Sequence, residues 1–189
     1  MPVASASVGG LSFQQFNYLT GGAGRVSLGA GGINPGATAV DSVLAAFAIP
    51  GSLFDGISNR GVRVTAFGTF AANTNVKTVK MIYAPTAAVV GSTIVGGTTL
   101  VATPALSAAT NSPWFLEAAI IDIVGANNQL GFQLSSWYAL AGALTDIATT
   151  APSALAADET KDIIVAITGN AATAVTDISL LYFNVQAFN

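Results

Sequence analysis

Apolar and polar residues alternate along much of this chain, with the period of two that is typical of β-strands. The clearest example is residues 61–83, GVRVTAFGTFAANTNVKTVKMIY. From Val62 onward every second residue of the first half is small or apolar, whereas Arg63 and Thr65 lie on the opposite face of an extended chain. Residues 71–76 interrupt the pattern with two asparagines and a threonine, which tolerate turn geometry. The pattern predicts two strands joined as a β-hairpin.

The predicted hairpin also carries half of the basic residues in the chain. Arg63, Lys77 and Lys80 are three of only six lysines and arginines. We expect them on the polar face of the hairpin, either in water or paired with an acidic partner. They are not candidates for catalysis.

Several other segments have the composition and spacing of strands, with turn residues between them. In residues 114–124 and 177–187 apolar side chains occupy both faces, so both faces must be covered. Where one of these faces points away from the core of a sandwich, the N-terminal segment or a partner would have to cover it. In residues 129–138 we expect Leu130, Phe132 and Leu134 to point inward. The further predicted strands are Val40–Ile49, Ser92–Ile94, Thr98–Ala102, Trp114–Val124, Gln129–Tyr138, Asp162–Thr168 and Asp177–Ala187. A short helix is the alternative in residues 40–49, because Val43, Leu44 and Phe47 also fit helical spacing.

About eight strands with almost no helix predict an all-β fold, an antiparallel jelly-roll sandwich. The sandwich spans residues 40–189, and residues 1–39 form an extended arm rich in Gly, Ser and Ala. The arm has too few apolar residues to pack a core unaided. Its large apolar side chains are expected to act as anchors, which either fold back on their own domain or dock on a neighbouring subunit. These anchors are Phe13, Phe16, Tyr18 and Leu19.

The chain has unusually little charge. Charged residues make up 8% of it and hydrophobic residues 52%, whereas a globular domain usually has about 25% charged residues. Surfaces so poor in charge favour association with other protein, and we expect a homo-oligomer. The net charge of −3 and the scattered basic residues exclude a phosphate-binding stripe, so we expect no nucleic-acid partner. The uncharged stretch between Lys80 and Glu117 is interrupted by prolines and glycines, so we expect no membrane partner.

The residue types that commonly perform catalysis are scarce. Histidine and cysteine are absent, which excludes a Ser–His–Asp or Cys–His site and removes the usual ligands of zinc. Glu117 and Asp122 are the best pair of acids for glycoside hydrolysis, but their spacing places them on opposite faces of a strand. The cluster at residues 158–162 is interpreted as a solvated turn rather than a calcium loop. We expect no enzymatic activity, no cofactor and no metal.

Three aromatic residues near predicted strand ends are candidates for contacts with other molecules. Aromatic residues at such positions are more often interface or core anchors than platforms for sugar binding. The candidate interface residues of the domain are therefore Trp114, Trp137 and Tyr138.

Residues 40–83 contain two motifs, D-x-x-L-x-x-F-x-I-P-x-x-L and R-V-T-A-x-G-T-x-A-x-N-x-N-x-K-T-V-K, and a W-x-L-E-A-x-I pattern follows at 114–120. These motifs resemble those of the small jelly-roll virion proteins of tailed bacteriophages. The resemblance covers about two thirds of the chain, and residues 1–39 have no counterpart in the pattern. The residues that carry the two longer motifs are Asp41, Leu44, Phe47, Ile49, Pro50, Leu53, Arg63, Val64, Thr65, Ala66, Gly68, Thr69, Ala71, Asn73, Asn75, Lys77, Thr78, Val79 and Lys80.

The resemblance implies a structural protein on the capsid surface of a virion. Such head decoration, or cement, proteins bind between major capsid proteins and are commonly trimers. The resemblance thus implies a homotrimer with the major capsid protein as its partner. The alternative is a fibre or tail-tip module that binds a host receptor or glycan.

Overall fold

The computed structural model describes residues 40–50, 53–54, 60–108, 112–171 and 177–188. In residues 1–39 it describes only the backbone of four short strands. These are β1 (Ser7–Val8), β2 (Leu11–Ser12), β3 (Gln15–Asn17) and β4 (Val26–Ser27).

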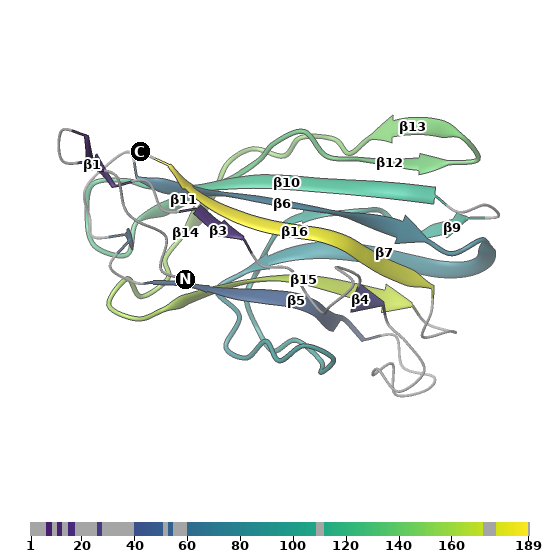
Figure 1. Cartoon of the computed structure of the whole chain (residues 1–189), viewed down its shortest axis with the longest axis horizontal. Coiled ribbons are helices and arrows are strands. Elements are labelled where there is room, and N and C mark those ends of the chain that lie inside the picture. The colour runs from purple at the N-terminus through teal and green to yellow at the C-terminus, as the bar shows by residue number, and fades with distance from the viewer. Residues whose placement is uncertain are drawn as a thin grey trace.

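The described part of the chain forms two antiparallel sheets packed face to face (Figure 1). The small sheet has the order β5-β15-β7-β8, and β9 also pairs with β7. Its strands are β5 (Ser42–Ile49), β7 (Asn73–Tyr83), β8 (Thr98–Ala102), β9 (Leu106–Ala108) and β15 (Ile163–Ala171).

The large sheet has the order β13-β12-β10-β6-β16-β3, and β4 also pairs with β16. Strand β10 pairs with β11 as well as with β12, and β11 pairs in turn with β14. The domain strands of this sheet are β6 (Gly61–Phe70), β10 (Ser112–Asp122), β11 (Gln129–Gln133), β12 (Trp137–Leu140), β13 (Ala143–Asp146), β14 (Ser153–Leu155) and β16 (Ile178–Phe188).

Successive long strands lie in opposite sheets, as in a jelly roll. The chain passes from β5 in the small sheet to β6 in the large one and back to β7, and later from β10 to β15 to β16 in the same alternating way. This order confirms the predicted antiparallel jelly-roll sandwich. The described part of the chain contains no helix with the length and apolar character that crossing a bilayer requires.

The predicted hairpin at residues 61–83 is wrong in its pairing, although both of its strands exist. β6 pairs with β10 and β16 in the large sheet, whereas β7 pairs with β15, β8 and β9 in the small one. The connection at Ala71–Ala72 therefore crosses from one sheet to the other. Each strand has one apolar face, and these faces meet across the core instead of lying side by side. Alternation reports which face is buried and not which strand is the neighbour, so both arrangements fit the sequence equally well.

The core lies between the two sheets and is built from the predicted inward faces. Val62, Val64 and Phe70 of β6 are fully buried. Trp114 of β10 is also fully buried, and its ring lies 6.3 Å from that of Phe70 between centroids. The prediction that Trp114 is an interface residue is therefore wrong, because its position on β10 directs it into the core, opposite Gly68 of β6.

Lys77 corrects another expectation, because its side chain is fully buried rather than in water. Its position on β7 places it on the same face as the core residues Val79 and Met81. The ammonium donates hydrogen bonds to the Asn73 carbonyl oxygen (3.1 Å), to Asn73 Oδ1 (2.7 Å) and to the Asn75 carbonyl oxygen (2.8 Å). Three donors thus meet three acceptors, which makes the burial of this charge tolerable.

Asp177, just before β16, completes this buried cluster. Its carboxylate accepts hydrogen bonds from Asn73 Nδ2 (2.6 Å) and from Asn75 Nδ2 (2.9 Å). Burial lowers the pKa of Lys77, and the nearby Asp177 carboxylate opposes that change. The cluster fastens the crossing between β6 and β7 to the start of β16. We call these four residues, Asn73, Asn75, Lys77 and Asp177, the lysine cluster.

The expected inward face of residues 129–138 is also wrong. Gln129 and Gln133 are buried, whereas Leu130 and Phe132 are only partly buried on the other face of β11. The buried amides are satisfied by the chain that follows: Gln133 Nε2 donates to the carbonyl oxygen of Ile147 (3.1 Å) and Gln129 Oε1 accepts from the backbone N–H of Ala157 (3.0 Å). Tertiary hydrogen bonds of this kind cannot be seen in an alternation pattern. The predicted strand at 92–94 is likewise reduced to a single bridge between Ser42 and Thr93.

Candidate functional site

Four aromatic side chains form a continuous row across the outer face of the large sheet. Phe115 of β10 is paired in register with Trp137 of β12 on one side and with Phe67 of β6 on the other. Phe67 is in turn paired with Tyr182 of β16. We call Trp137, Phe115, Phe67 and Tyr182 the aromatic row.

The rings at the two ends of the aromatic row are stacked on their neighbours. The Phe115 and Trp137 rings lie 5.7 Å apart between centroids at an interplanar angle of 12°. The Phe67 and Tyr182 rings lie 5.2 Å apart at 15°. Stacking covers one face of each of these four rings, which leaves less open ring face for an outside molecule. A flat sugar ring needs an exposed aromatic face, so this geometry suits apolar protein side chains better.

The aromatic row is partly open to solvent. Phe67, at its centre, is 39% exposed and is the one exposed aromatic residue in the described ranges. Phe115, Trp137 and Tyr182 are each partly buried. An exposed stripe of aromatic side chains on a sheet is an unusual feature for a protein surface that meets only water.

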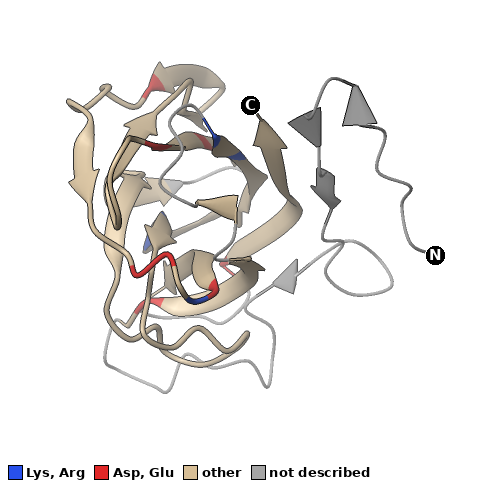
Figure 2. Cartoon of the chain, turned by 90° about the vertical axis from the view of Figure 1, so that its left-hand side faces the viewer, with Lys and Arg blue, Asp and Glu red and all other residues tan. Residues whose placement is uncertain are grey.

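The charged side chains on the outer face of β6 and β10 form one ion pair, close to the aromatic row. Arg63 of β6 bonds Glu117 of β10, with Nη2 at 2.7 Å and Nε at 2.8 Å from the same carboxylate oxygen, Oε1. Thr65 Oγ1 also donates to Oε1, at 3.3 Å. The two charges cancel, so the outer face of the central strands carries no net charge. Figure 2 shows how few segments of the described ribbon carry charged residues.

The outer face of the small sheet differs, because the chain covers part of it. The segment between β7 and β8 folds back and bonds the edge of β5, where Val43 N donates to Ser92 O (2.9 Å) and Ile94 N donates to Asp41 O (3.0 Å). Ala166, which alternation places on the outer face of β15, is fully buried. In Figure 1 this segment runs below β5 and β15, on the side away from the large sheet.

The residues predicted to form an interface do not lie together in the part of the chain that the structure describes. Trp137 belongs to the aromatic row, whereas its neighbour Tyr138 points to the other face of β12 and packs against the core. Phe13, Tyr18 and Leu19 lie outside the described residues, and of Phe16 only the backbone is described, in β3 paired with Val185. Sequence reasoning missed Phe67, Phe115 and Tyr182 as site residues. Alternation could place Phe67 and Phe115 on an outer face, but only the strand register shows that the four aromatic residues are neighbours.

The two candidate acids for glycoside hydrolysis, Glu117 and Asp122, lie on opposite faces of β10. Glu117 points outward to Arg63, whereas Asp122 is buried on the inner face of β10, as their spacing predicts. Within the described ranges no three residues among Asp, Glu, His and Cys are grouped closely enough to hold a metal ion.

The charged turn at residues 158–162 binds its own chain. Glu159 accepts hydrogen bonds from the backbone N–H groups of Asn127 (2.8 Å) and Asn128 (3.2 Å). Asp158 pairs with Lys161 at 2.6 Å and also accepts from Thr160. Hydrogen bonds from Lys161 and then Thr160 lower the pKa of Asp158 to about 2. This turn therefore fastens the chain between β14 and β15 to the turn before β11.

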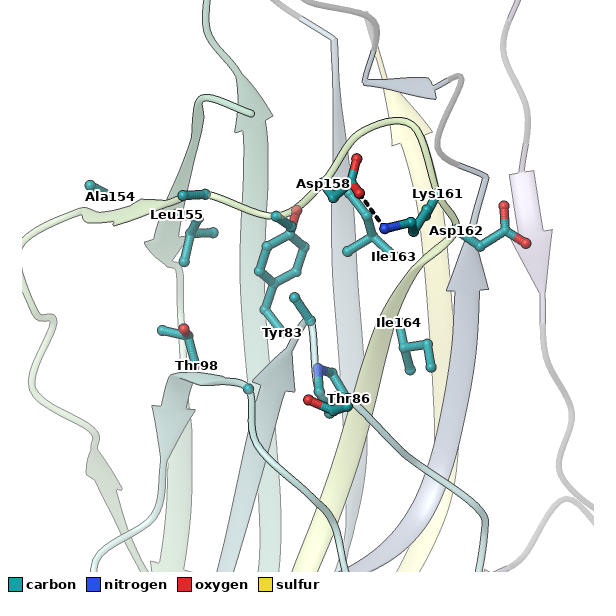
Figure 3. Close-up of a pocket in the computed structure, with 15 residues that line it drawn as sticks. Tyr83, Thr86, Thr98, Ala154, Leu155, Asp158, Lys161, Asp162, Ile163 and Ile164 are labelled. Carbon is teal, nitrogen blue, oxygen red and sulfur yellow. Dashed lines mark ion pairs between the residues drawn. The ribbon is translucent and has the colours of Figure 1, made fainter. Parts of the chain in front are cut away.

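The same turn borders a shallow hollow of about 650 Å³ above Tyr83 (Figure 3). The Tyr83 side chain is buried beneath it, and its hydroxyl donates to Gln129 Oε1 at 3.3 Å. The Asp158 and Lys161 side chains at the rim pair with each other (Figure 3). The hollow combines a self-neutralised ion pair with mainly small side chains, so it has little chemistry with which to select a ligand.

The buried Tyr83 hydroxyl predicts a pH dependence of stability. Burial, and then the negative charges of Glu159 and Asp122, raise the pKa of Tyr83. Above about pH 10 the unfolded phenol loses its proton while the folded one keeps it, so the folded state binds more protons and stability falls as pH rises. We expect the free energy of unfolding to fall by up to about 1.4 kcal/mol per pH unit in this range, and this component to vanish in Tyr83→Phe.

Urea unfolding of both proteins at a series of pH values from neutral to alkaline measures this effect. Tyr83→Phe should cost about 1 kcal/mol at neutral pH, since it removes one hydrogen bond. Identical alkaline slopes in the two proteins would show that the Tyr83 hydroxyl does not contribute.

Comparisons of this chain with protein-family models, curated proteins and solved structures found no match. The resemblance to the virion proteins of tailed bacteriophages therefore stays a prediction from the motifs in the sequence.

Proposed function

We propose that this chain is a structural virion protein, a capsid decoration protein that binds between major capsid proteins and stabilises a phage head. The observation that carries the proposal is the outer face of the large sheet, where a partly exposed aromatic row lies beside a neutral ion pair. A broad, nearly uncharged sheet surface suits a protein that works by contact over a wide area.

The residues that carry the family resemblance support the same proposal through the fold. Asn73, Asn75 and Lys77 of the N-x-N-x-K motif form the lysine cluster with Asp177. Arg63 of the second motif pairs with Glu117. Gly68 of the same motif packs against Trp114. These five motif residues all help to build the sandwich, so the resemblance concerns architecture rather than a reaction. We accordingly propose a homo-oligomeric, non-enzymatic protein located on the capsid surface.

Binding to phage heads tests the proposed function. Purified full-length protein should co-sediment with expanded heads of the phage that encodes it, at a fixed ratio to the major capsid protein. Heads that carry the protein should release their DNA at a higher temperature than heads that lack it. Val124→Glu is the control for a surface substitution, since Val124 is 68% exposed and lies outside the strands of both sheets.

Two outcomes would contradict this function. One is failure to bind heads at any stage of their maturation. The other is saturable binding to host cells or their surface polysaccharide by the isolated protein, which would favour the receptor-binding or glycan-binding module of a fibre.

A further inference from the structure

We propose that the aromatic row is the surface through which copies of this chain meet, with Phe67 at the centre of the contact. This inference rests on the proposed function for its choice of a second copy as the partner. Three observations on the described residues lead to it: the position of the row, the charge around it and the area of the face.

The position of the aromatic row is central in the sheet. β6, which carries Phe67, has β10 on one side and β16 on the other along its whole length. A contact centred on Phe67 would therefore be surrounded by sheet on both sides. Residues at the centre of an interface lose the most water and contribute most of its binding energy, and aromatic residues are enriched there.

The charge around the aromatic row allows contact with an identical surface. Arg63 and Glu117 neutralise each other within one chain, so the same face of a second copy brings no like charge to the centre. Asp146 is an exposed acid paired in register with Trp137, at the margin of the sheet. At that margin it would lie on the hydrated rim of the contact, where charged residues are tolerated.

The area of the face approaches that of a specific interface. β6, β10 and β16 are each about ten residues long, and β11 together with β12 fills a fourth position beside β10. At about 4.8 Å between strands and about 3.3 Å per residue, these four positions cover roughly 600 Å², without the extra area of protruding side chains. Specific interfaces bury about 800 Å² on each partner. The small sheet has part of its outer face covered by the segment between β7 and β8, so the large sheet offers the wider open surface.

The test uses the purified full-length protein alone, so that self-association and binding to heads are measured separately. Size-exclusion chromatography with light scattering gives the subunit number over a wide range of concentration. We expect wild type to be an oligomer and Phe67→Glu to raise the subunit dissociation constant by about a hundredfold or more, because it brings like charges together in the contact. Val89→Glu is the matched control, since Val89 is 66% exposed on the segment that covers the small sheet.

A second measurement does not depend on how well Phe67→Glu folds. The chain has no cysteine, so Phe67→Cys and Val89→Cys each introduce a single thiol. A short bis-maleimide should join copies through Cys at position 67 and leave the position 89 variant as single chains.

Several results would overturn the proposal. They are a wild type that is monomeric at every concentration, an unchanged oligomer in Phe67→Glu, or equal cross-linking at positions 67 and 89. A monomer whose thiol at position 67 is protected would show that another segment of the same chain occupies the row. If copies associate as expected but heads are not bound, the interface stands and the capsid function fails.

Discussion

Replacing Lys77 with methionine is expected to lower the free energy of unfolding by about 3–5 kcal/mol. Methionine keeps most of the volume of the lysine stem but has no ammonium. Three carbonyl oxygens that now accept from Lys77 Nζ would lose that donor inside the protein. Asn73 Oδ1 would keep its hydrogen bond from the Asn75 backbone N–H (3.0 Å), so the loss falls mainly on the two backbone carbonyl oxygens, at about 1–3 kcal/mol for each unsatisfied acceptor. The buried Asp177 carboxylate would also lose a nearby compensating charge.

Lys80 provides the matched control on the same strand. It lies on the opposite face of β7, with its side chain 32% exposed, and pairs with Asp41 at 2.7 Å. Lys80→Met should cost at most about 1 kcal/mol, as is usual for partly exposed ion pairs. Urea unfolding followed by tryptophan fluorescence measures both variants, since Trp114 is buried in the core. Equal losses in the two variants would contradict a structural role for the lysine cluster.

Replacing Gly68 with alanine is expected to cost about 3 kcal/mol or more, although the change adds only one methyl group. A Cβ atom at this position would lie 1.9 Å from the carbonyl oxygen of Ser179 and 2.4 Å from the Trp114 ring. The ring could turn aside, but the backbone of β16 could retreat only by breaking its register with β6. A close-packed core transmits such a displacement rather than absorbing it.

Gly142 is the control for the effect of adding a methyl group to a glycine. It adopts a φ of +83° in the turn between β12 and β13, and a Cβ there would meet nothing within 4 Å. Gly142→Ala should therefore cost only the backbone strain, about 1–2 kcal/mol. Thermal unfolding followed by circular dichroism compares the two variants. The packing argument would be wrong if Gly68→Ala unfolded at the same temperature as Gly142→Ala.

Alternation in the sequence was sufficient to predict most of the strands and the class of fold. β5, β6, β7, β8, β10, β15 and β16 all overlap segments that are predicted as strands, and in β6, β7, β10, β15 and β16 the apolar period of two is the signal. The period also separates Glu117 from Asp122 correctly, because it fixes the face of each residue within one strand. What it cannot supply is the identity of the neighbouring strand, which is why β6 and β7 were expected to pair.

Polar residues on inner faces were the second limit of the sequence pattern. Lys77 is buried because groups two and four residues before it satisfy its ammonium, and Gln129 and Gln133 because more distant backbone groups satisfy their amides. Those partners are 2 to 28 residues away, and the folded chain alone brings the distant ones into place. The alternation in β7 does indicate that Lys77 is buried, since Lys77 lies on the same face as Val79 and Met81. For Gln129 and Gln133 the alternation in residues 129–138 predicts exposure, because it directs Leu130, Phe132 and Leu134 inward instead.

The candidate site was predicted least well, for a reason that follows from sheet geometry. Trp137 was singled out, but its three partners come from β10, β6 and β16, which are far apart in the sequence. Their alignment depends on a register shift in β16 between Leu180 and Tyr182, which brings Tyr182 opposite Phe67. A bulge of this kind changes the face of every residue after it, so a row of aromatic residues across four strands becomes visible only in the structure.

The most direct measurement of the proposed role is an electron-microscopy map of intact particles of the phage that encodes this chain. If the chain is a capsid decoration protein, the map will show jelly-roll subunits grouped on the outer surface of the head, with their large sheets facing one another through Phe67. Heads without such density, or subunits found only at a tail or fibre tip, would contradict that role.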